Sequence, residues 1–381
     1  MGYHIVIILS IVFCATCFES PGRTAFPGSM MRRDPGHYPG YYYSISNVLL
    51  NPSSKTFQIN SKRAKSERFL NKPWPIETVT EPMVTCDEVH NKGYVFVIFY
   101  HYDSNYFHMH VDTLMPLFKA IYYKQENRNR PVVIIPAVEK ERLESLDWET
   151  PAFDNSSIYW MQMLKFISGR NKLLPLNAKL LARGQNICFR EISFGTSSYT
   201  VFPEHEDIIL KYIKFVRDQF QIVMPQPHSK IRVGLIKRTG RRLILNEDDI
   251  IKAVKPFTEI DVINFDGMTF RKQIEVVQKY SVLIGMNGAG LINALFAPPF
   301  TCAVQLVPYE AQTNHKAFGT LLTAKGPYLE WHNQHKDLHF VKADGTNHNA
   351  DTVVNVDEFR KLVREALEWA RQARHNYREE L

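Results

Sequence analysis

The clearest pattern in the C-terminal half of the chain is a series of short apolar, β-branched runs separated by segments with helical spacing. Segment 247–254 predicts an amphipathic helix, and so does segment 270–280, which carries one apolar stripe. Strands that alternate with helices at this spacing favour a parallel sheet with right-handed crossovers, a Rossmann-like half. The predicted strands are 231–236, 259–265, 281–286 and 302–307.

The N-terminal half repeats this alternation more weakly, with buried strands predicted at Tyr94–Tyr100 and Pro131–Ile135. The expected architecture is therefore α/β, with two Rossmann-like domains that face a cleft. A long C-terminal helix is predicted from the apolar spacing over 359–377, and Asn355 with Glu358 fits a capping pair at its start.

Composition agrees with two globular units. The 381 residues are 45% hydrophobic, enough to fill a sizeable core in each of two domains. Four Pro-Gly dipeptides between residues 21 and 40 indicate a loose stem. The expected divisions are a leader at 1–17, a Pro/Gly-rich stem and N-terminal extension at 18–80, and domains at 81–225 and 226–381.

The first residues indicate a secretory location. The apolar run Ile5–Phe18 is shorter than the roughly 20 residues of a comfortable membrane span. Ala15 and Cys17 supply the small residues of a cleavage site, so we expect a signal peptide, with a short uncleaved anchor as the alternative. Asn155 opens an N-glycosylation sequon, which suits a secretory lumen.

Three cysteines lie outside the leader: Cys86, Cys188 and Cys302. They permit one disulfide and one remaining thiol, and the spacing leaves the choice of pair open.

The charge balance and the absent motifs exclude several classes of protein. Lys and Arg exceed Asp and Glu by 46 to 39, a net charge of +7, but the basic residues are scattered, which argues against a nucleic-acid partner. No GxSxG elbow, P-loop, HExxH or Asp-x-Asp motif occurs, and the cysteines lack metal-ligand spacing. We therefore expect no metal and no resident cofactor.

The segment Met286–Leu291 (MNGAGL) is the first candidate site, because it ends a predicted strand and opens a helix. Backbone N–H groups and the helix dipole at such a turn can hold a phosphate, and glycine lets the chain approach an anion closely. The alternative is a tight turn that serves only helix–sheet packing.

The segment Lys237–Arg242 (KRTGRR) follows the first predicted strand of the same half. The carboxyl ends of parallel strands border the ligand crevice, so these cations should face the same pocket as the glycine turn. Arginine pairs two phosphate oxygens and keeps its charge. A solvated basic hairpin is the alternative.

The third candidate lies in the N-terminal half. If Asn105 caps a helix, His108 and Asp112 share one of its faces and could supply a general base. The alternative is structural: a core histidine, and an aspartate that fixes the backbone near Pro116.

Three segments in order, 238–247, 286–291 and 304–309 with His315, resemble glycosyltransferase family 61. Asn105, His108, Asp112 and the run 114–118 resemble the N-terminal signature of that family. The resemblance covers about 94–333. It implies a GT-B fold, UDP-GlcNAc as donor, inversion at the anomeric carbon and no metal requirement. It makes 81–225 the acceptor domain and 226–381 the nucleotide-sugar-binding domain. The implied acceptor is an O-linked glycan such as O-mannose, or a Ser/Thr hydroxyl, on a secretory or membrane glycoprotein.

Carried over by position, the resemblance makes Asp112 the expected base, with His108 as runner-up. Arg238 and Arg242 would neutralise the diphosphate, and Gly288 to Gly290 would cradle it. The full set of implied donor-binding residues is Arg238, Arg242, Asn246, Asn287, Gly288, Ala289, Gly290 and Gln305.

Two positions depart from the family pattern, which usually has His at 287 and Glu at 305. They motivate a second hypothesis, a catalytically inactive member that acts as a glycan- or protein-binding scaffold. A nucleotide-dependent oxidoreductase is disfavoured because no GxGxxG with a following ribose-binding acid occurs.

The last residues, Arg378–Leu381 (REEL), resemble a retrieval signal of the KDEL type. Together with the leader they favour the endoplasmic reticulum lumen or membrane, with the Golgi as the alternative. Contact with the membrane is expected only if the N-terminal segment stays uncleaved.

Overall fold

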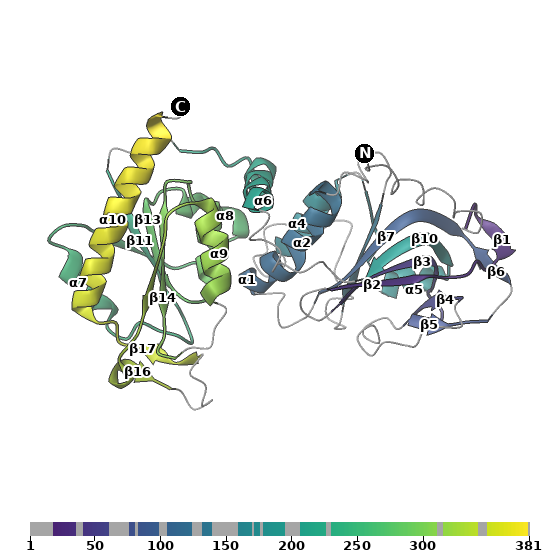
Figure 1. Cartoon of the computed structure of the whole chain (residues 1–381), viewed down its shortest axis with the longest axis horizontal. Coiled ribbons are helices and arrows are strands. Elements are labelled where there is room, and N and C mark those ends of the chain that lie inside the picture. Colours follow the sequence, from purple (N-terminus) through teal and green to yellow (C-terminus); the bar gives the residue numbers. More distant parts are fainter. Residues whose placement is uncertain are drawn as a thin grey trace, which may run out of the picture. The chain divides into compact units, whose positions relative to one another are not determined.

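The structure, a computed structural model, describes residues 18–35, 41–60, 76–80, 83–98, 105–123, 132–138, 159–169, 171–175, 178–194, 206–225, 230–310, 315–341 and 349–379. The chain divides into two compact units (Figure 1). The first unit comprises 1–104, 109–152 and 160–200, and the second comprises 105–108, 153–159 and 201–381. The leader, Asn155 and the end of REEL lie outside the described residues.

The first unit is built on an eight-stranded mixed sheet with the order β5-β4-β3-β10-β7-β8-β9, and β2 pairs with β3. Strands β10, β7, β8 and β9 run parallel, whereas β3 is antiparallel to β2, β4 and β10. The strands are β2 (Met31–Pro35), β3 (Tyr41–Asn51), β4 (Thr56–Ile59), β5 (Ile76–Thr78), β7 (Glu88–Ile98), β8 (Val133–Val138), β9 (Lys172–Leu173) and β10 (Ile187–Phe194). Both strands predicted in this half are confirmed, in β7 and β8.

Segment 18–80 differs from the loose stem expected of it. It contributes β1 (Gly22–Ala25), which pairs with β6 (Met83–Cys86), and strands β2 to β5 of the main sheet. In β3, Ile45, Val48 and Leu50 are fully buried in the core of the sheet. The Pro-Gly punctuation obscured this apolar strand, whose burial is what orders the segment.

The helices of the first unit are short. Beyond α1 (Tyr106–His108), which belongs to the second unit, the same helical run continues through π-helical and α-helical turns. The run consists of η2 (Met109–Leu114), α2 (Met115–Phe118) and η3 (Lys119–Tyr123). Two separate helices come later in the chain, α4 (Tyr159–Ser168) and α5 (Ala178–Arg183).

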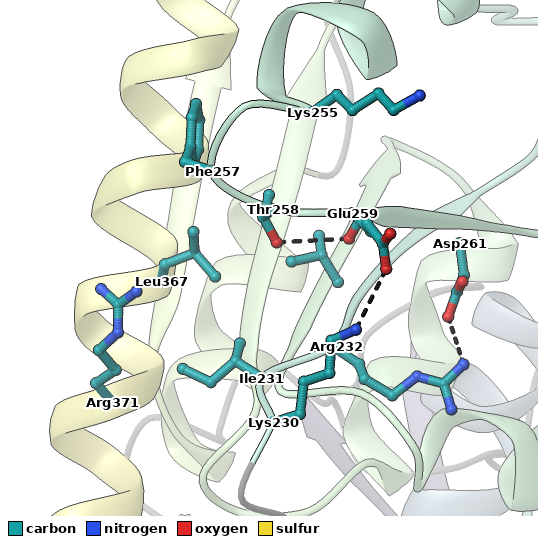
Figure 2. A pocket seen from close by; sticks show the side chains of 11 residues that line it. Lys230, Ile231, Arg232, Lys255, Phe257, Thr258, Glu259, Asp261, Leu367 and Arg371 are labelled. Carbon is teal, nitrogen blue, oxygen red and sulfur yellow. Dashed lines mark hydrogen bonds and ion pairs between the residues drawn. The ribbon is translucent and has the colours of Figure 1, made fainter.

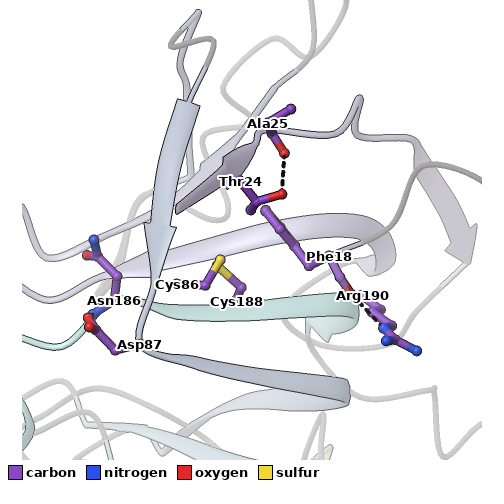
Figure 3. The surroundings of a disulfide bond; sticks show 8 residues. All are labelled: Phe18, Thr24, Ala25, Cys86, Asp87, Asn186, Cys188 and Arg190. Carbon is purple, nitrogen blue, oxygen red and sulfur yellow. Dashed lines mark hydrogen bonds between the residues drawn. A yellow bond between two sulfur atoms is a disulfide. The ribbon is translucent and has the colours of Figure 1, made fainter. Parts of the chain in front are cut away.

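A disulfide joins Cys86, at the end of β6, to Cys188 in β10 (Figure 3). It spans 102 residues of sequence and lies in a small apolar cluster with Phe18, Phe26 and Val84. The bond therefore ties the β1–β6 pair to the main sheet. Cys302, the remaining cysteine among the described residues, is a buried thiol.

The second unit is built on a five-stranded parallel sheet with the order β12-β11-β13-β14-β15 (Figure 1). The strands are β11 (Val233–Ile236), β12 (Ile260–Ile263), β13 (Val282–Met286), β14 (Cys302–Val307) and β15 (Tyr328–His332). The helices are α6 (Glu206–Phe220), α7 (Glu247–Val254), α8 (Phe270–Val277), η7 (Ala289–Phe296), α9 (His315–Lys325), η8 (Lys336–Leu338) and α10 (Val356–Glu379), and β16 (His339–Phe340) pairs with β17 (Asp351–Thr352).

Alternate residues of these strands face opposite layers, because side chains in a strand alternate between the two faces. Leu235, Ile284 and Val304 pack in one core with residues of α7 and α10. On the other face, Gly285 lies against Leu291 of η7, and Gly319 of α9 lies against Tyr328 of β15. Both faces are covered, which explains the unbroken apolar runs of the sequence.

The predictions for this half are confirmed for the four strands, for α7 and α8, and for the long terminal helix. The prediction missed α9 and β15, because their apolar residues are interrupted by polar ones. Asn355 does cap α10, accepting hydrogen bonds from the backbone N–H groups of Asp357 and Glu358 at 3.1 Å. The Glu358 carboxylate instead accepts from Trp331 Nε1 at 2.7 Å, so the reciprocal half of the capping pair is absent. Among the described residues, no helix has the length and apolar character to cross a membrane.

Removal of the disulfide should destabilise the first unit. We expect the double variant Cys86→Ser/Cys188→Ser to lose about 2–5 kcal/mol of unfolding free energy, because the unfolded chain regains the entropy of a long loop. Urea unfolding measures the loss. Non-reducing peptide mapping provides the check on pairing: it should link Cys86 to Cys188 and recover Cys302 as a free thiol. A peptide that links Cys302, or an unchanged unfolding free energy, would contradict the structure.

Candidate functional site

The candidate site of the second unit lies at the carboxyl edge of its parallel sheet. Strands β11 and β13 are hydrogen-bonded neighbours, so the segments that follow them emerge side by side. Arg238 comes two residues after β11, and Asn287 directly follows β13. The backbone N–H of Asn287 donates to Leu306 O at 2.7 Å, which fixes the turn to β14. The structure therefore brings together the arginine and glycine motifs that the sequence placed 50 residues apart.

Gly288 is the point of closest approach between the two motifs. A Cβ atom on Gly288 would lie 2.0 Å from Arg238 Nη1 and 2.8 Å from its Cζ. The Arg238 guanidinium therefore occupies the space that any larger side chain at 288 would need. Gly288 begins the helix η7, and no side chain caps that end of the helix. The glycine thus admits a cation beside an uncapped helix start, an arrangement that suits an anion.

Arg242 is buried beside this turn in a strained backbone conformation. Its φ angle is +57°, in the left-handed region that an arginine rarely adopts, and its side chain is only 6% exposed. Arg242 Nη1 donates to Asn287 Oδ1 at 3.2 Å. The next residue is held by Asp351, whose Oδ1 accepts from Leu243 N at 2.8 Å. The surrounding contacts thus keep the Arg242 guanidinium directed into the interior.

The electrostatics of this cluster are unbalanced. Among the described residues, no carboxylate forms an ion pair with Arg238, Arg241 or Arg242. Burial, followed by the like charges of Arg238 and Arg241, lowers the pKa of Arg242 to about 9. Burial and then Arg241 lower the pKa of Arg238 as well. Both arginines therefore carry their charge at a higher cost in free energy than in water, and a bound anion would offset that cost.

The unsatisfied polar atoms of the cluster are all donors. Arg242 Nε and Asn287 Nδ2 are buried and have no hydrogen-bond partner among the described residues. Asn287 is only 3% exposed. A buried donor without a partner is costly, so these two N–H groups indicate a ligand rich in acceptor oxygens. A phosphate has that chemistry.

Gln305 lies in β14 and pairs with Gly285 of β13. Both residues are therefore on the face of the sheet that packs against η7. Gln305 is fully buried, and its Oε1 accepts from Tyr328 Oη at 2.6 Å. Tyr328 Oη also contacts Glu330 Oε1, and Glu330 Oε2 lies 2.9 Å from His332 Nε2. Burial and the neighbouring Glu330 raise the pKa of Tyr328. Tyr328 and Glu330 could not be identified from the sequence, because they lie in β15, the strand that was not predicted.

Asn246 is the predicted donor-binding residue that the structure does not bring into the cluster. Its Nδ2 donates to Val354 O at 2.8 Å, and its Oδ1 accepts from Val354 N at 2.9 Å. Both ends of the amide are therefore used to hold the segment that leads into α10. Ala289 and Gly290 do lie in the first turn of η7.

His108 and Asp112 belong to different units. His108 ends α1, which is grouped with the second unit and contacts η7, the helix of the glycine turn. Asp112 lies in the π-helical turn η2 of the first unit. The predicted cap is confirmed, since Asn105 Oδ1 accepts from His108 N at 3.3 Å. π-Helical turns occur frequently at functional sites, which draws attention to Asp112.

Within the described segments, no group of three or more His, Cys, Asp or Glu side chains is arranged to hold a metal ion.

A separate cavity of about 560 Å³ lies in the second unit, at the N-terminal ends of β11 and β12 (Figure 2). Its two carboxylates are already in ion pairs. Glu259 Oε2 lies 3.3 Å from Lys230 Nζ, and Asp261 Oδ2 lies 2.6 Å from Arg232 Nη2. Ligands of open parallel sheets bind outside the carboxyl ends of the strands, which is the opposite edge. The arginine cluster, and not this cavity, is therefore the candidate site.

Buried cations also hold the far end of η7. Arg217 Nη2 donates to Phe296 O at 2.9 Å, and Lys325 Nζ donates to Thr301 O at 2.9 Å. Gln278 Nε2 donates to Phe296 O at 2.7 Å. These three side chains fix the connection from η7 to β14. Sequence reasoning missed them, because they stand far apart along the chain.

Comparison with known proteins adds the family context. The sequence profile of the family described as Glycosyltransferase 61 matches residues 106–304, which is more than half of the chain. The match begins at α1 and includes the arginine segment and the glycine turn.

Characterised relatives match at modest identity. The chain is 24% identical over 308 residues to the EGF domain-specific O-linked N-acetylglucosamine transferase of Drosophila melanogaster, covering 74% of this chain and 54% of that protein. It is 23% identical over 259 residues to protein O-linked-mannose β-1,4-N-acetylglucosaminyltransferase 2 of Xenopus laevis, covering 61% and 41%. The human protein of that name is 24% identical over 197 residues, covering 45% and 33%. The chain therefore spans about half or less of the length of these relatives.

Replacement of Arg238 or Gly288, the two residues at which the arginine and glycine motifs approach most closely, should weaken anion binding. We expect Arg238→Ala to reduce the affinity for UDP and for pyrophosphate at least about tenfold, the scale of a lost charge-assisted hydrogen bond. Gly288→Ala should have a similar effect, because its methyl group displaces the Arg238 guanidinium. Isothermal titration calorimetry measures both. Arg232→Ala, at the opposite edge of the sheet, is the matched control and should bind like wild type. If wild type and all three variants bound UDP and pyrophosphate equally well, the assignment of the arginine cluster as the anion site would be wrong.

The buried Lys325 should make stability depend on pH. Burial and then the like charge of Arg217 lower its pKa to about 7, well below its ordinary value, while Cys302 acts in the opposite direction. The folded state then binds fewer protons than the unfolded state above about pH 7, so the unfolding free energy gains a positive slope with pH between about 7 and about 10. Lys325→Met should lose that contribution.

Urea unfolding across this pH range tests the slope. Lys316→Met, an exposed lysine at the start of the same helix, is the control and should follow wild type. If the Lys325→Met curve ran parallel to wild type, Lys325 would not titrate in this window.

Proposed function

This chain belongs to the glycosyltransferase 61 family, and on that premise we propose that it transfers N-acetylglucosamine from UDP-GlcNAc to an O-linked glycan or a Ser/Thr hydroxyl of a glycoprotein. The observation that carries the proposal is the arginine cluster at the carboxyl edge of the second unit's sheet. Its excess positive charge and two unpaired buried donors match the diphosphate of a nucleotide sugar.

The leaving group of such a transfer is UDP, which departs with negative charge on its β-phosphate. In the proposed arrangement, Arg238 and Arg242 neutralise the diphosphate, and the start of η7 at Gly288 supplies backbone N–H groups. Asn287 contributes its unpaired amide hydrogens. Because these groups supply the charge stabilisation, we propose that the reaction proceeds without a metal ion.

The reaction we propose inverts the anomeric carbon in a single displacement. The acceptor oxygen forms its bond to C1 while the bond from C1 to the phosphate oxygen breaks, and the hydroxyl proton passes to a carboxylate. Asp112 is the proposed base, and His108 is the second candidate. His110, the nearby histidine, is unsuited to carrying charge, since burial lowers its pKa to about 3. In the GT-B arrangement that we propose, the first unit presents the acceptor and the second unit binds the donor.

Gln305 is proposed to complete the donor site by contact with the ribose. Its amide is fixed by Tyr328, which in turn contacts the Glu330 carboxylate. Tyr328 Oη already donates to Gln305 Oε1, whereas Gln305 Nε2 is a buried donor without a hydrogen-bond partner among the described residues. We therefore propose that Gln305 Nε2 donates to an oxygen of the ribose.

The acceptor class follows the names of the relatives, which refer to EGF domains and to O-linked mannose. We propose a protein-bound acceptor of this kind, such as O-mannose or a Ser/Thr hydroxyl. The Cys86–Cys188 disulfide suits an oxidising compartment, so we place the protein in the lumen of the endoplasmic reticulum, with the Golgi as the alternative.

Transferase activity should be detectable with a panel of UDP-sugars and two acceptors, O-mannosyl peptides and folded EGF modules, with products read by mass spectrometry. We expect a mass gain of one N-acetylhexosamine from UDP-GlcNAc and an undiminished rate in the presence of EDTA. Asp112→Asn should lower kcat by about 10²-fold or more at unchanged UDP affinity, the usual scale for loss of a general base.

The variants His108→Gln and Asp112→Asn separate the two proposed bases, since only the true base should show the larger loss. UDP-GlcNAc binding without turnover on any acceptor would favour the alternative, a catalytically inactive scaffold. Activity abolished by EDTA and restored by a divalent cation would contradict the metal-independent reaction.

A further inference from the structure

A chain of buried side-chain hydrogen bonds links the glycine turn to α1. Asn293 of η7 donates from Nδ2 to Gly290 O at 3.1 Å and to Gln273 Oε1 at 2.9 Å. Gln273 of α8 donates from Nε2 to Tyr106 Oη at 3.0 Å. The two amides are 0% and 4% exposed. Three elements that are distant in sequence, η7, α8 and α1, therefore share one polar path through the interior of the second unit.

The direction of each bond in this chain is fixed. Asn293 Nδ2 carries two hydrogens, and one of its acceptors is the carbonyl of Gly290, which can only accept. Gln273 Nε2 likewise donates to the carbonyl of Met268 at 3.1 Å as well as to Tyr106. Neither amide can be turned over without losing a bond to a backbone carbonyl. The path from Gly290 to Tyr106 therefore has a single arrangement.

Aromatic contacts hold Tyr106, the residue at the α1 end of this hydrogen-bond path. The Tyr106 ring stacks on Tyr159 with centroids 4.4 Å apart and planes 4° apart. The next residue, Phe107, packs against Phe318 of α9 at 4.5 Å. His108 follows directly, and its backbone N–H donates a hydrogen bond to Asn105 Oδ1. The position of His108 in the second unit is thus determined by the same α1 residues that receive the hydrogen bond from Gln273.

We infer that Asn293 and Gln273 are positioning residues that couple the donor-binding glycine turn to the helical run carrying the proposed bases. The inference rests on the proposed function. Neither side chain needs to touch the donor or the acceptor. Asn293 holds the carbonyl of Gly290, while Gln273 holds Tyr106, so a displacement at the donor turn is transmitted to α1.

The chain offers a matched pair of variants to test this coupling. Gln273 and Gln278 are both buried glutamines at α8, and both are hydrogen-bonded to η7. Gln273 accepts from Asn293 Nδ2 at 2.9 Å, and Gln278 donates to Phe296 O at 2.7 Å. Gln278 Nε2 donates to Ile274 O and, at the far end of η7, to Phe296 O; within the described part of the chain it forms no hydrogen bond to α1. Gln273→Met and Gln278→Met therefore remove the same chemical group at similar cost to packing, but only the first breaks the path.

Hydrogen exchange in the ligand-free protein tests the path independently of catalysis. We expect faster exchange of the amides of Phe107 and His108 in Gln273→Met and in Asn293→Leu, and unchanged exchange there in Gln278→Met. If α1 exchanged equally in all three variants, the inference would be overturned, whatever the enzyme does.

Kinetics and UDP binding supply the second readout. We expect Gln273→Met to lower kcat about tenfold, the scale of one lost hydrogen bond, at an affinity for UDP within about twofold of wild type. Tyr106→Phe should give a similar loss, and the double variant Gln273→Met/Tyr106→Phe should lose no more than either single variant. Additive losses would show that the two residues act separately and would overturn the coupling.

The two proposals fail in different ways. A wild-type protein that neither binds UDP nor transfers a sugar contradicts the proposed function, while the exchange experiment still decides whether the path holds α1. A wild-type transferase whose Gln273→Met variant matches Gln278→Met in both readouts contradicts the path alone.

Discussion

An uncompensated positive charge at the carboxyl edge of the second unit's sheet is the constraint on which the candidate site depends. Arg238, Arg241 and Arg242 lie close enough for their like charges to lower the pKa of Arg242, and no carboxylate among the described residues forms an ion pair with them. Folding brings these charges together at a cost, which is visible in the lowered pKa of Arg242 and in its left-handed backbone. An anion that binds in the cluster offsets this cost, and a nucleotide diphosphate supplies the required charge.

The helix η7 connects that charge to the rest of the second unit. Its first turn lies beside Arg238, its middle residue Asn293 bonds toward α8 and α1, and its last carbonyls accept from Arg217 and Gln278. Asn293 and Gln278 are buried, and Arg217 and Arg238 are half-buried. A rigid support of this kind is what a site needs if phosphate oxygens are to be met by donors already in place.

Much of the second unit could be predicted from sequence, because its strands are buried on both faces and stand out as apolar runs. The glycine turn and the arginine segment were identified for the same reason: both follow such strands directly. The stem at 18–80 could not be read correctly, since proline and glycine masked the apolar residues of β3. The hydrogen-bond path through Gln273 and Asn293 has no sequence signature at all, because it depends on how α8, η7 and α1 pack.

Asn246, Tyr328 and Glu330 show why local sequence spacing could not predict the whole site. Asn246 stands beside the arginines in sequence, but both ends of its amide bind Val354, a partner 108 residues away that local spacing cannot reveal. Tyr328 and Glu330 show the opposite case, because they lie outside every predicted element and yet flank Gln305 from the neighbouring strand. Long-range pairing decided the role of each.

The most direct test of the central claim is an experimental structure of the protein with UDP bound. We expect density for the diphosphate between Arg238, Arg242 and the backbone of Gly288 to Gly290, with Asn287 Nδ2 within hydrogen-bond distance of a phosphate oxygen. Density for UDP in the cavity near Lys255 and Arg371, with the arginine cluster unchanged, would contradict it.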